Sequence, residues 1–89
     1  MASIRIPTPL RPYTGNSETV SVSGTTIAEA LNDLTTQYPD LKPHLFNEGK
    51  LRSFVNIFLG EDDVRYLDGV ETAIEEGSQI MIIPSIAGG

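Results

Sequence analysis

One stretch of this chain has the period of an amphipathic helix, and it lies among segments that have the period of strands. Its apolar residues recur three and four positions apart, at Ile27, Ala30, Leu31, Leu34 and Tyr38. Side chains at that spacing share one face of a helix. Thr26 and Glu29 fit a capping box at the start, and Pro39 disfavours helical geometry in the residue before it. We therefore predict a single long helix from Thr26 to Tyr38.

The segments on either side of this helix favour strands. Alternation of polar and apolar residues predicts strands at Ser3–Ile6 and Thr19–Ser23, with a stiff proline-containing loop between them. After an irregular region, Phe54–Leu59 is rich in residues that favour strands. We predict a short return strand at Val64–Tyr66. The apolar run within Ser78–Ile83 is typical of a central strand that is covered on at least part of both faces.

The predicted order is two strands, one helix and three strands, in a chain of 89 residues. A chain of this length closes one core, and a mixed sheet wrapped around the helix is the simplest way to bury one helical stripe. We expect an α+β fold of the β-grasp type, with four to five strands packed on one main helix. The first and last strands should be central, parallel neighbours. Residues 1–84 should form the domain, and residues 85–89 an extended, flexible tail.

The composition argues against several classes of function. Six basic residues against twelve acidic ones give a formal charge of −6. Binding to nucleic acid or to an anionic membrane needs clustered Lys and Arg, so neither partner is expected. No apolar run approaches the roughly 20 residues of a membrane span, and the first residues lack the pattern of a signal peptide. We expect a cytoplasmic protein.

The side chains offer little catalytic chemistry. Cysteine is absent, which excludes disulfides, thiol nucleophiles and cysteine-ligated metal. His44 is the only imidazole and is interpreted as a loop or surface residue. The acidic pair Asp62 and Asp63 lacks the regular ligand spacing of a calcium loop. We therefore expect no bound metal or cofactor, and a protein that is not itself an enzyme.

The C-terminal segment carries the most specific signal, because the chain ends in Gly88 and Gly89. A carboxylate is a poor acyl donor, but ATP can convert it to an acyl-adenylate, from which a sulfur nucleophile displaces AMP. Residues without a Cβ would let the terminal carboxylate enter a narrow active site on another protein. The alternative is a flexible tail without a chemical role, which is common at chain termini.

Several short stretches resemble one known family over the whole chain. They are Ile6-Pro7-Thr8, Leu10-Arg11-Pro12, Thr14-Gly15, Phe54-Val55-Asn56-Ile57, Asp63-Val64-Arg65 and Ala87-Gly88-Gly89. In these the chain resembles the ThiS/MoaD sulfur carriers, which are ubiquitin-like β-grasp proteins ending in Gly-Gly. The N-terminal loop leans toward the branch that serves cysteine biosynthesis. Molybdopterin-synthase small subunits and thiamin-pathway carriers share the fold and the tail, and they remain alternatives.

The resemblance implies a partner enzyme of the E1-like class that consumes ATP, adenylates Gly89 and converts it to a thiocarboxylate. In the cysteine branch, the thiocarboxylate attacks an aminoacrylate on a pyridoxal-phosphate-dependent cysteine synthase, and a metal-dependent peptidase releases the adduct. In the molybdopterin branch, the tail inserts into the large subunit of the synthase. Some members are conjugated to lysines as protein tags. A further alternative is a ubiquitin-like binding module with an inert tail.

We also predict a docking surface for the adenylating enzyme. Alternation places Phe54, Phe58, Met81 and Ile83 on the sheet face opposite the helix, beside the exit of the tail. A register error of one residue, or loops covering this face, would remove the patch. Arg11 is interpreted either as a solvated surface residue or as a partner for a carboxylate of the enzyme. The tail residues Ile86 and Ala87 are expected to contact the partner together with Gly88 and Gly89.

Overall fold

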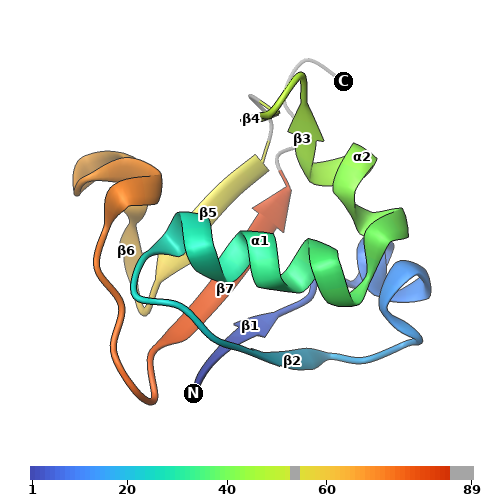
Figure 1. The fold of residues 1–89 in the computed structure, drawn as a ribbon, viewed down its shortest axis with the longest axis horizontal. Helices are drawn as coiled ribbons and strands as arrows, with labels where there is room; N and C mark the ends of the chain where they lie inside the picture. The colour runs from blue at the N-terminus through green and yellow to red at the C-terminus, as the bar shows by residue number, and fades with distance from the viewer. Residues whose placement is uncertain (53–54, 85–89) are drawn as a thin grey trace.

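A computed structural model of the protein describes residues 1–52 and 55–84. A mixed sheet of five strands, in the order β2-β1-β7-β5-β6, lies against one long helix (Figure 1). The strands and the helix are β1 (Ala2–Arg5), β2 (Thr19–Val22), α1 (Ile27–Gln37), β5 (Val55–Leu59), β6 (Asp62–Asp63) and β7 (Gln79–Pro84). This is the predicted β-grasp arrangement.

The first and last strands are neighbours at the centre of the sheet, as predicted. β1 and β7 run parallel, with Ile4 opposite Ile80, and β2 pairs antiparallel with the other edge of β1. β5 pairs antiparallel with β7, with Ile57 opposite Ile82. These four isoleucines are almost completely buried, so the sheet contributes a continuous apolar layer to the core.

The helix α1 begins where the capping residues predict. The Thr26 hydroxyl accepts a hydrogen bond from the Glu29 N–H at 3.2 Å. The Glu29 carboxylate accepts from the Thr25 N–H at 2.7 Å and from the Thr25 hydroxyl at 3.0 Å. The Thr25 N–H bond is the main cause of a lowered pKa of Glu29. The helix ends at Gln37, because Tyr38 before Pro39 takes non-helical angles.

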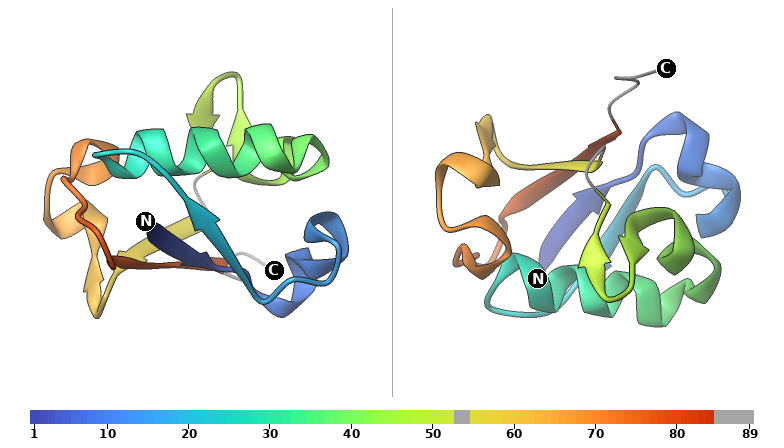
Figure 2. Two further views of the ribbon diagram at one scale, coloured as in Figure 1. Left: turned by 60° about the horizontal axis from the view of Figure 1, so that its bottom comes forward. Right: turned by 90° about the horizontal axis from the view of Figure 1, so that it is seen from above.

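The core lies between α1 and the inner face of the sheet, which Figure 2 shows as two layers. The predicted helical stripe supplies Ile27, Ala30, Leu31 and Leu34, all fully buried. The loop residues Leu41 and Leu45 close one end of the core and are also fully buried. Burying the apolar face of a single helix in this way is the main favourable term for a domain of this size.

The segments between the main elements hold more regular structure than the sequence predicts. The proline-containing loop forms a 3₁₀-helix, η1 (Thr8–Thr14). After α1 come η2 (Pro39–Leu41), α2 (Lys42–Leu45) and a two-stranded hairpin. The hairpin strands are β3 (Phe46–Asn47) and β4 (Lys50–Leu51). Short elements of this kind escape prediction because tertiary packing stabilises them rather than their own period.

The predicted return strand at Val64–Tyr66 is wrong. This segment is the 3₁₀-helix η3 (Val64–Tyr66), followed by η4 (Gly69–Glu71), and the return strand is β6, two residues earlier. The Asp63 carboxylate accepts a hydrogen bond from the Arg65 N–H at 2.9 Å. This hydrogen bond stabilises the helical turn after Asp63, so Val64–Tyr66 does not take the extended geometry of a strand. No helix within the described residues is long and apolar enough to cross a bilayer.

Gly24 is a position where the fold requires glycine. Its φ is +142°, and an added Cβ would lie 2.7 Å from the Glu29 Cβ and 3.1 Å from the Ala30 nitrogen. Gly77 also has positive φ, at +83°, but an added Cβ there would meet nothing within 4 Å. We expect Gly24→Ala to lower the free energy of unfolding by about 2–4 kcal/mol and Gly77→Ala by about 1 kcal/mol. Urea unfolding followed by circular dichroism measures both, and equal losses would contradict the steric argument.

Candidate docking face of the sheet

The face of the sheet opposite α1 carries a small apolar patch, formed by Phe58, Met81 and Ile83. Phe58 lies directly opposite Met81 across β5 and β7. Phe58 and Met81 are half-buried, whereas Ile83 is 38% exposed. Their neighbours along the same strands, Ile57 and Ile82, are buried on the helix side. The register is therefore the one predicted from alternation.

Charged residues flank the patch on both sides. Arg5 in β1 lies opposite Met81, and Asp63 in β6 lies opposite Phe58. Arg5 is exposed, and among the residues that the structure describes no carboxylate lies within 4.0 Å of its guanidinium. A depression of about 450 Å³ beside Arg5 and Met81 extends to Glu61. An apolar centre with charged flanks is the usual composition of a protein interface.

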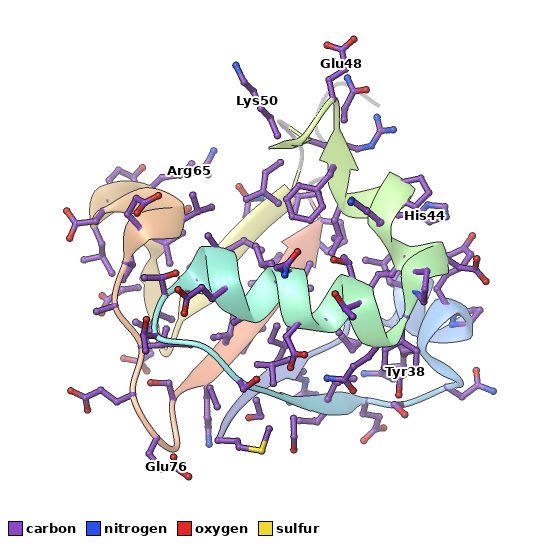
Figure 3. The ribbon with its side chains drawn as sticks, in the orientation of Figure 1. Tyr38, His44, Glu48, Lys50, Arg65 and Glu76 are labelled. Atoms are coloured by element: carbon purple, nitrogen blue, oxygen red, sulfur yellow. The ribbon has the colours of Figure 1, made fainter. Side chains whose placement is uncertain are left out.

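Asp63 and Arg65 form an ion pair at the edge of this face. The Arg65 Nη2 lies 3.0 Å from the Asp63 Oδ2, and the Arg65 N–H donates to Oδ1. The pKa of the Asp63 carboxyl is lowered, chiefly by the hydrogen bond from the Arg65 side chain and then by that from its backbone N–H. Figure 3 shows Arg65 on the segment that follows β6.

Arg11 has a structural role that the sequence does not reveal. Its Nε donates to the Ile6 carbonyl at 3.1 Å, and its Nη1 lies 3.8 Å from a Glu18 carboxylate oxygen. Its side chain is only 24% exposed, so the interpretation as a freely solvated arginine is wrong. These contacts hold η1 against the end of β1. A contact between Arg11 and a partner stays a prediction.

His44 packs against an aromatic ring of η1. Its ring stacks on that of Tyr13, with centroids 4.1 Å apart and an angle of 29° between the planes. The stack joins α2 to η1. Within residues 1–52 and 55–84, no group of three His, Cys, Asp or Glu side chains could hold a metal ion.

The remaining predicted site residues lie outside the described part of the chain. They are Phe54, Ile86, Ala87, Gly88 and Gly89. The last described residue is Pro84 at the end of β7, opposite Val55 in β5. In the sequence, the final five residues follow directly on β7, the strand that carries Met81 and Ile83.

The sequence did not single out Arg5, Asp63 and Arg65 as neighbours of the patch. Arg5 comes from a strand far from β5 and β7 in the chain, and the predicted return strand began after Asp63. The alternation in β1 was the available signal, because it places Arg5 on the face opposite Ile4. The sequence predicted that the first and last strands pair, but only the structure gave the register that puts Arg5 opposite Met81.

The sheet has five strands and packs on one helix, and its first and last strands run parallel at the centre. This is the β-grasp fold of ubiquitin-like proteins. The model of the ThiS family matches residues 4–89, and the chain belongs to this family. The sulfur carrier protein CysO of Mycobacterium tuberculosis is 41% identical over 90 residues, covering 98% of this chain and 97% of that protein.

Solved structures agree with the family assignment. A chain in the crystal structure of the Amycolatopsis orientalis BexX/CysO complex matches with a TM-score of 0.91 and 34% identity, over 100% of both chains. The small archaeal modifier protein 1 from Methanosarcina acetivorans matches with a TM-score of 0.90 and 28% identity, over 99% of this chain and 95% of that one.

The ion pair at the edge of the docking face has a measurable titration. We expect the Asp63 carboxyl to titrate below the usual range for aspartate in an NMR pH titration, and Arg65→Gln to move its midpoint upward. Because the folded pKa lies below the unfolded one, the pair stabilises the fold above the unfolded pKa. This contribution is lost as the pH falls through the folded pKa. An unchanged midpoint in Arg65→Gln would show that the side-chain contact does not form in solution.

Proposed function

We propose that this protein is a sulfur carrier whose reactive group is the Gly89 carboxylate. The observation that carries the proposal is the Gly88-Gly89 terminus of a chain that belongs to the ThiS family. Its similarity to the sulfur carrier protein CysO over 98% of the chain supports the same function. In this role the protein is a co-substrate, and no side chain of its own needs to be catalytic.

The proposed reaction takes place in two steps on an E1-like adenylating enzyme. The Gly89 carboxylate attacks the α-phosphorus of ATP, and pyrophosphate leaves. Sulfide then attacks the acyl carbon and AMP leaves, which yields the thiocarboxylate. If a protein persulfide is the nucleophile instead, the product is an acyl disulfide, and a second thiol must attack the donor's sulfur to release the thiocarboxylate and form a disulfide. The β-grasp domain supplies recognition, while the glycines let the reacting carbon enter the enzyme.

Cysteine biosynthesis is the branch that we favour, because the relative that matches nearly the whole chain is a protein named CysO. The thiocarboxylate sulfur would add to an aminoacrylate held by a pyridoxal-phosphate-dependent enzyme. A metal-dependent peptidase would then release the cysteine from Gly89. Supply of sulfur to molybdopterin synthase or to the thiamin pathway uses the same activated carboxylate, and these branches differ only in the acceptor.

We further propose that the patch of Phe58, Met81 and Ile83 docks on the adenylating enzyme. Support comes from its place on β5 and β7, since the chain continues from β7 toward Gly89. Arg5 on one side and the Asp63–Arg65 pair on the other would set the orientation of the complex. Charges at such a rim affect the rate and specificity of association more than its final affinity.

Intact-mass spectrometry tests the reaction itself. After incubation with the adenylating enzyme, ATP and sulfide, we expect a gain of about 16 Da, because sulfur replaces one oxygen of the activated carboxylate. A chain lacking Gly89 should show no gain. The enzyme must first be shown to modify a carrier that it is known to use. If this chain's mass then stays unchanged, or if the gain persists in the chain that lacks Gly89, the proposal is contradicted.

The docking patch is tested by Phe58→Asp. A charge in the apolar centre should reduce the rate of ATP–pyrophosphate exchange at subsaturating carrier at least about tenfold, as expected for loss of one strong interface contact. Leu67→Asp is the matched control, because Leu67 is an apolar residue that is 46% exposed outside the sheet. Circular dichroism must show that both variants fold. Equal exchange rates in a folded Phe58→Asp variant would exclude this face.

Protein modification is a second candidate function, favoured by the likeness to the small archaeal modifier protein 1. The same adenylate could acylate a lysine amine, and AMP would leave. In the incubation above with a lysine-containing target, this function predicts a covalent adduct between Gly89 and a lysine Nζ instead of the thiocarboxylate.

A further inference from the structure

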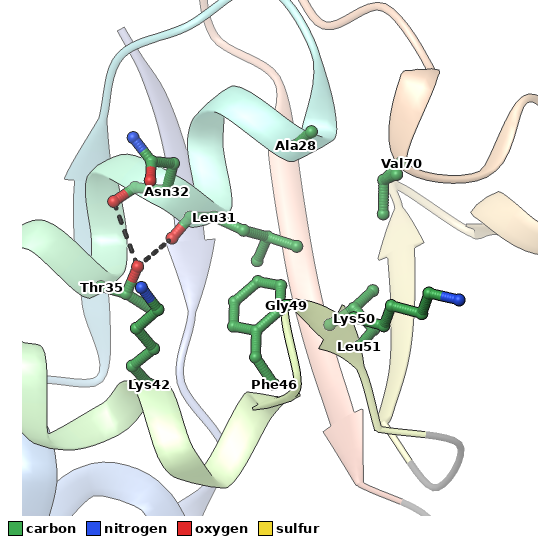
Figure 4. A pocket seen from close by; sticks show the side chains of 10 residues that line it. All are labelled: Ala28, Leu31, Asn32, Thr35, Lys42, Phe46, Gly49, Lys50, Leu51 and Val70. Carbon is green, nitrogen blue, oxygen red and sulfur yellow. Dashed lines mark hydrogen bonds between the residues drawn. The ribbon is translucent and has the colours of Figure 1, made fainter.

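An apolar groove lies on the helix side of the molecule, between α1 and the β3–β4 hairpin (Figure 4). Its volume is about 430 Å³, which is within the range of ligand sites. One wall comes from the hairpin, where Phe46 lies directly opposite Leu51. Val70 of η4 closes one end. These three apolar side chains are half-buried, so each remains partly open to the groove.

The other wall is a stripe of α1 with helical spacing, from Ala28 through Leu31 and Asn32 to Thr35. This stripe is about 10 Å long, at 1.5 Å per residue. The Thr35 hydroxyl donates to the Leu31 and Asn32 carbonyls, at 3.1 and 3.2 Å. The Thr35 hydroxyl is therefore already satisfied by hydrogen bonds within the helix. By contrast, the Asn32 side-chain amide is exposed and makes no hydrogen bond to any described residue.

Both lysines of the chain line this groove. Lys42 and Lys50 are the only lysines in the sequence, and both are exposed. Within the described residues, neither ammonium lies within 4.0 Å of a carboxylate. Even Glu48, in the turn of the same hairpin, does not pair with Lys50 (Figure 3). The groove is therefore locally basic on a protein whose net charge is −6.

We propose that this groove binds a short acidic, amphipathic peptide segment of another protein. Two or three apolar side chains of the segment would contact Phe46, Leu51 and Val70, and flanking carboxylates would pair with Lys42 and Lys50. The free Asn32 amide can both donate to and accept from a peptide backbone. A second copy of this chain fits less well, because two molecules of charge −6 repel each other.

The groove is separate from the docking face of the sheet. Figure 2 shows α1 and the hairpin on the same side of the sheet, whereas Phe58, Met81 and Ile83 face the opposite side. A protein bound in the groove would therefore leave the sheet face available. The inference does not depend on the reaction proposed for Gly89, since it concerns other residues and another ligand.

The test is an NMR titration of the full ¹⁵N-labelled chain with a blocked ten-residue peptide, in which two leucines and a phenylalanine are flanked by glutamates. We expect saturable shifts of the amides of Phe46, Lys50, Leu51 and Val70, and no shift at Met81. A peptide with glutamine in place of each glutamate should bind at least about fivefold more weakly, as loss of surface ion pairs implies. Added salt should weaken binding of the acidic peptide.

Charge-reversal variants provide matched controls. Lys42→Glu and Lys50→Glu should each weaken binding of the acidic peptide at least about fivefold, whereas Arg5→Glu, with the same change in charge, should change it less than about twofold. If all three variants weaken peptide binding equally, the weakening comes from the change in net charge alone, and the proposal is overturned. Absence of groove shifts at about 2 mM peptide, or equal binding of the glutamine peptide, would also overturn it. Groove shifts on concentrating the chain alone would assign the groove to a second copy instead.

Discussion

The parallel pairing of β1 with β7 is the contact on which the rest of the molecule depends. It joins the two ends of the domain at the centre of the sheet, with Ile4 beside Ile80. Parallel neighbours need a crossover between them, and here the crossover includes α1, which covers one face. The other face carries the patch of Phe58, Met81 and Ile83.

This arrangement separates the molecule into two surfaces. One is the open sheet face, with a small apolar patch between Arg5 and Asp63. The other is the helix side, where α1 and a short hairpin leave a groove beside both lysines. A carrier that visits several partners in turn benefits from such separation, because each partner can use its own contacts.

The prediction from sequence was accurate where local signals and tertiary packing agreed. The helix could be located because its stripe, its Thr26 cap and Pro39 all point to the same boundaries. It was inaccurate at Val64–Tyr66, because strand-forming composition competes there with the Asp63 cap on the Arg65 N–H. It also missed that Arg11 binds the Ile6 carbonyl. A contact of this kind depends on how η1 folds back, and no periodic pattern encodes that.

The sequence by itself determined the helix, the inward sides of the main strands and the terminal Gly-Gly, since period and residue type are local properties of the chain. Only the tertiary structure decided which distant residues are neighbours. It placed Arg5 opposite Met81, stacked His44 on Tyr13, and brought Lys42 and Lys50 to one groove. These contacts join elements that lie apart along the chain, and they form only when the shared core fixes the elements in place.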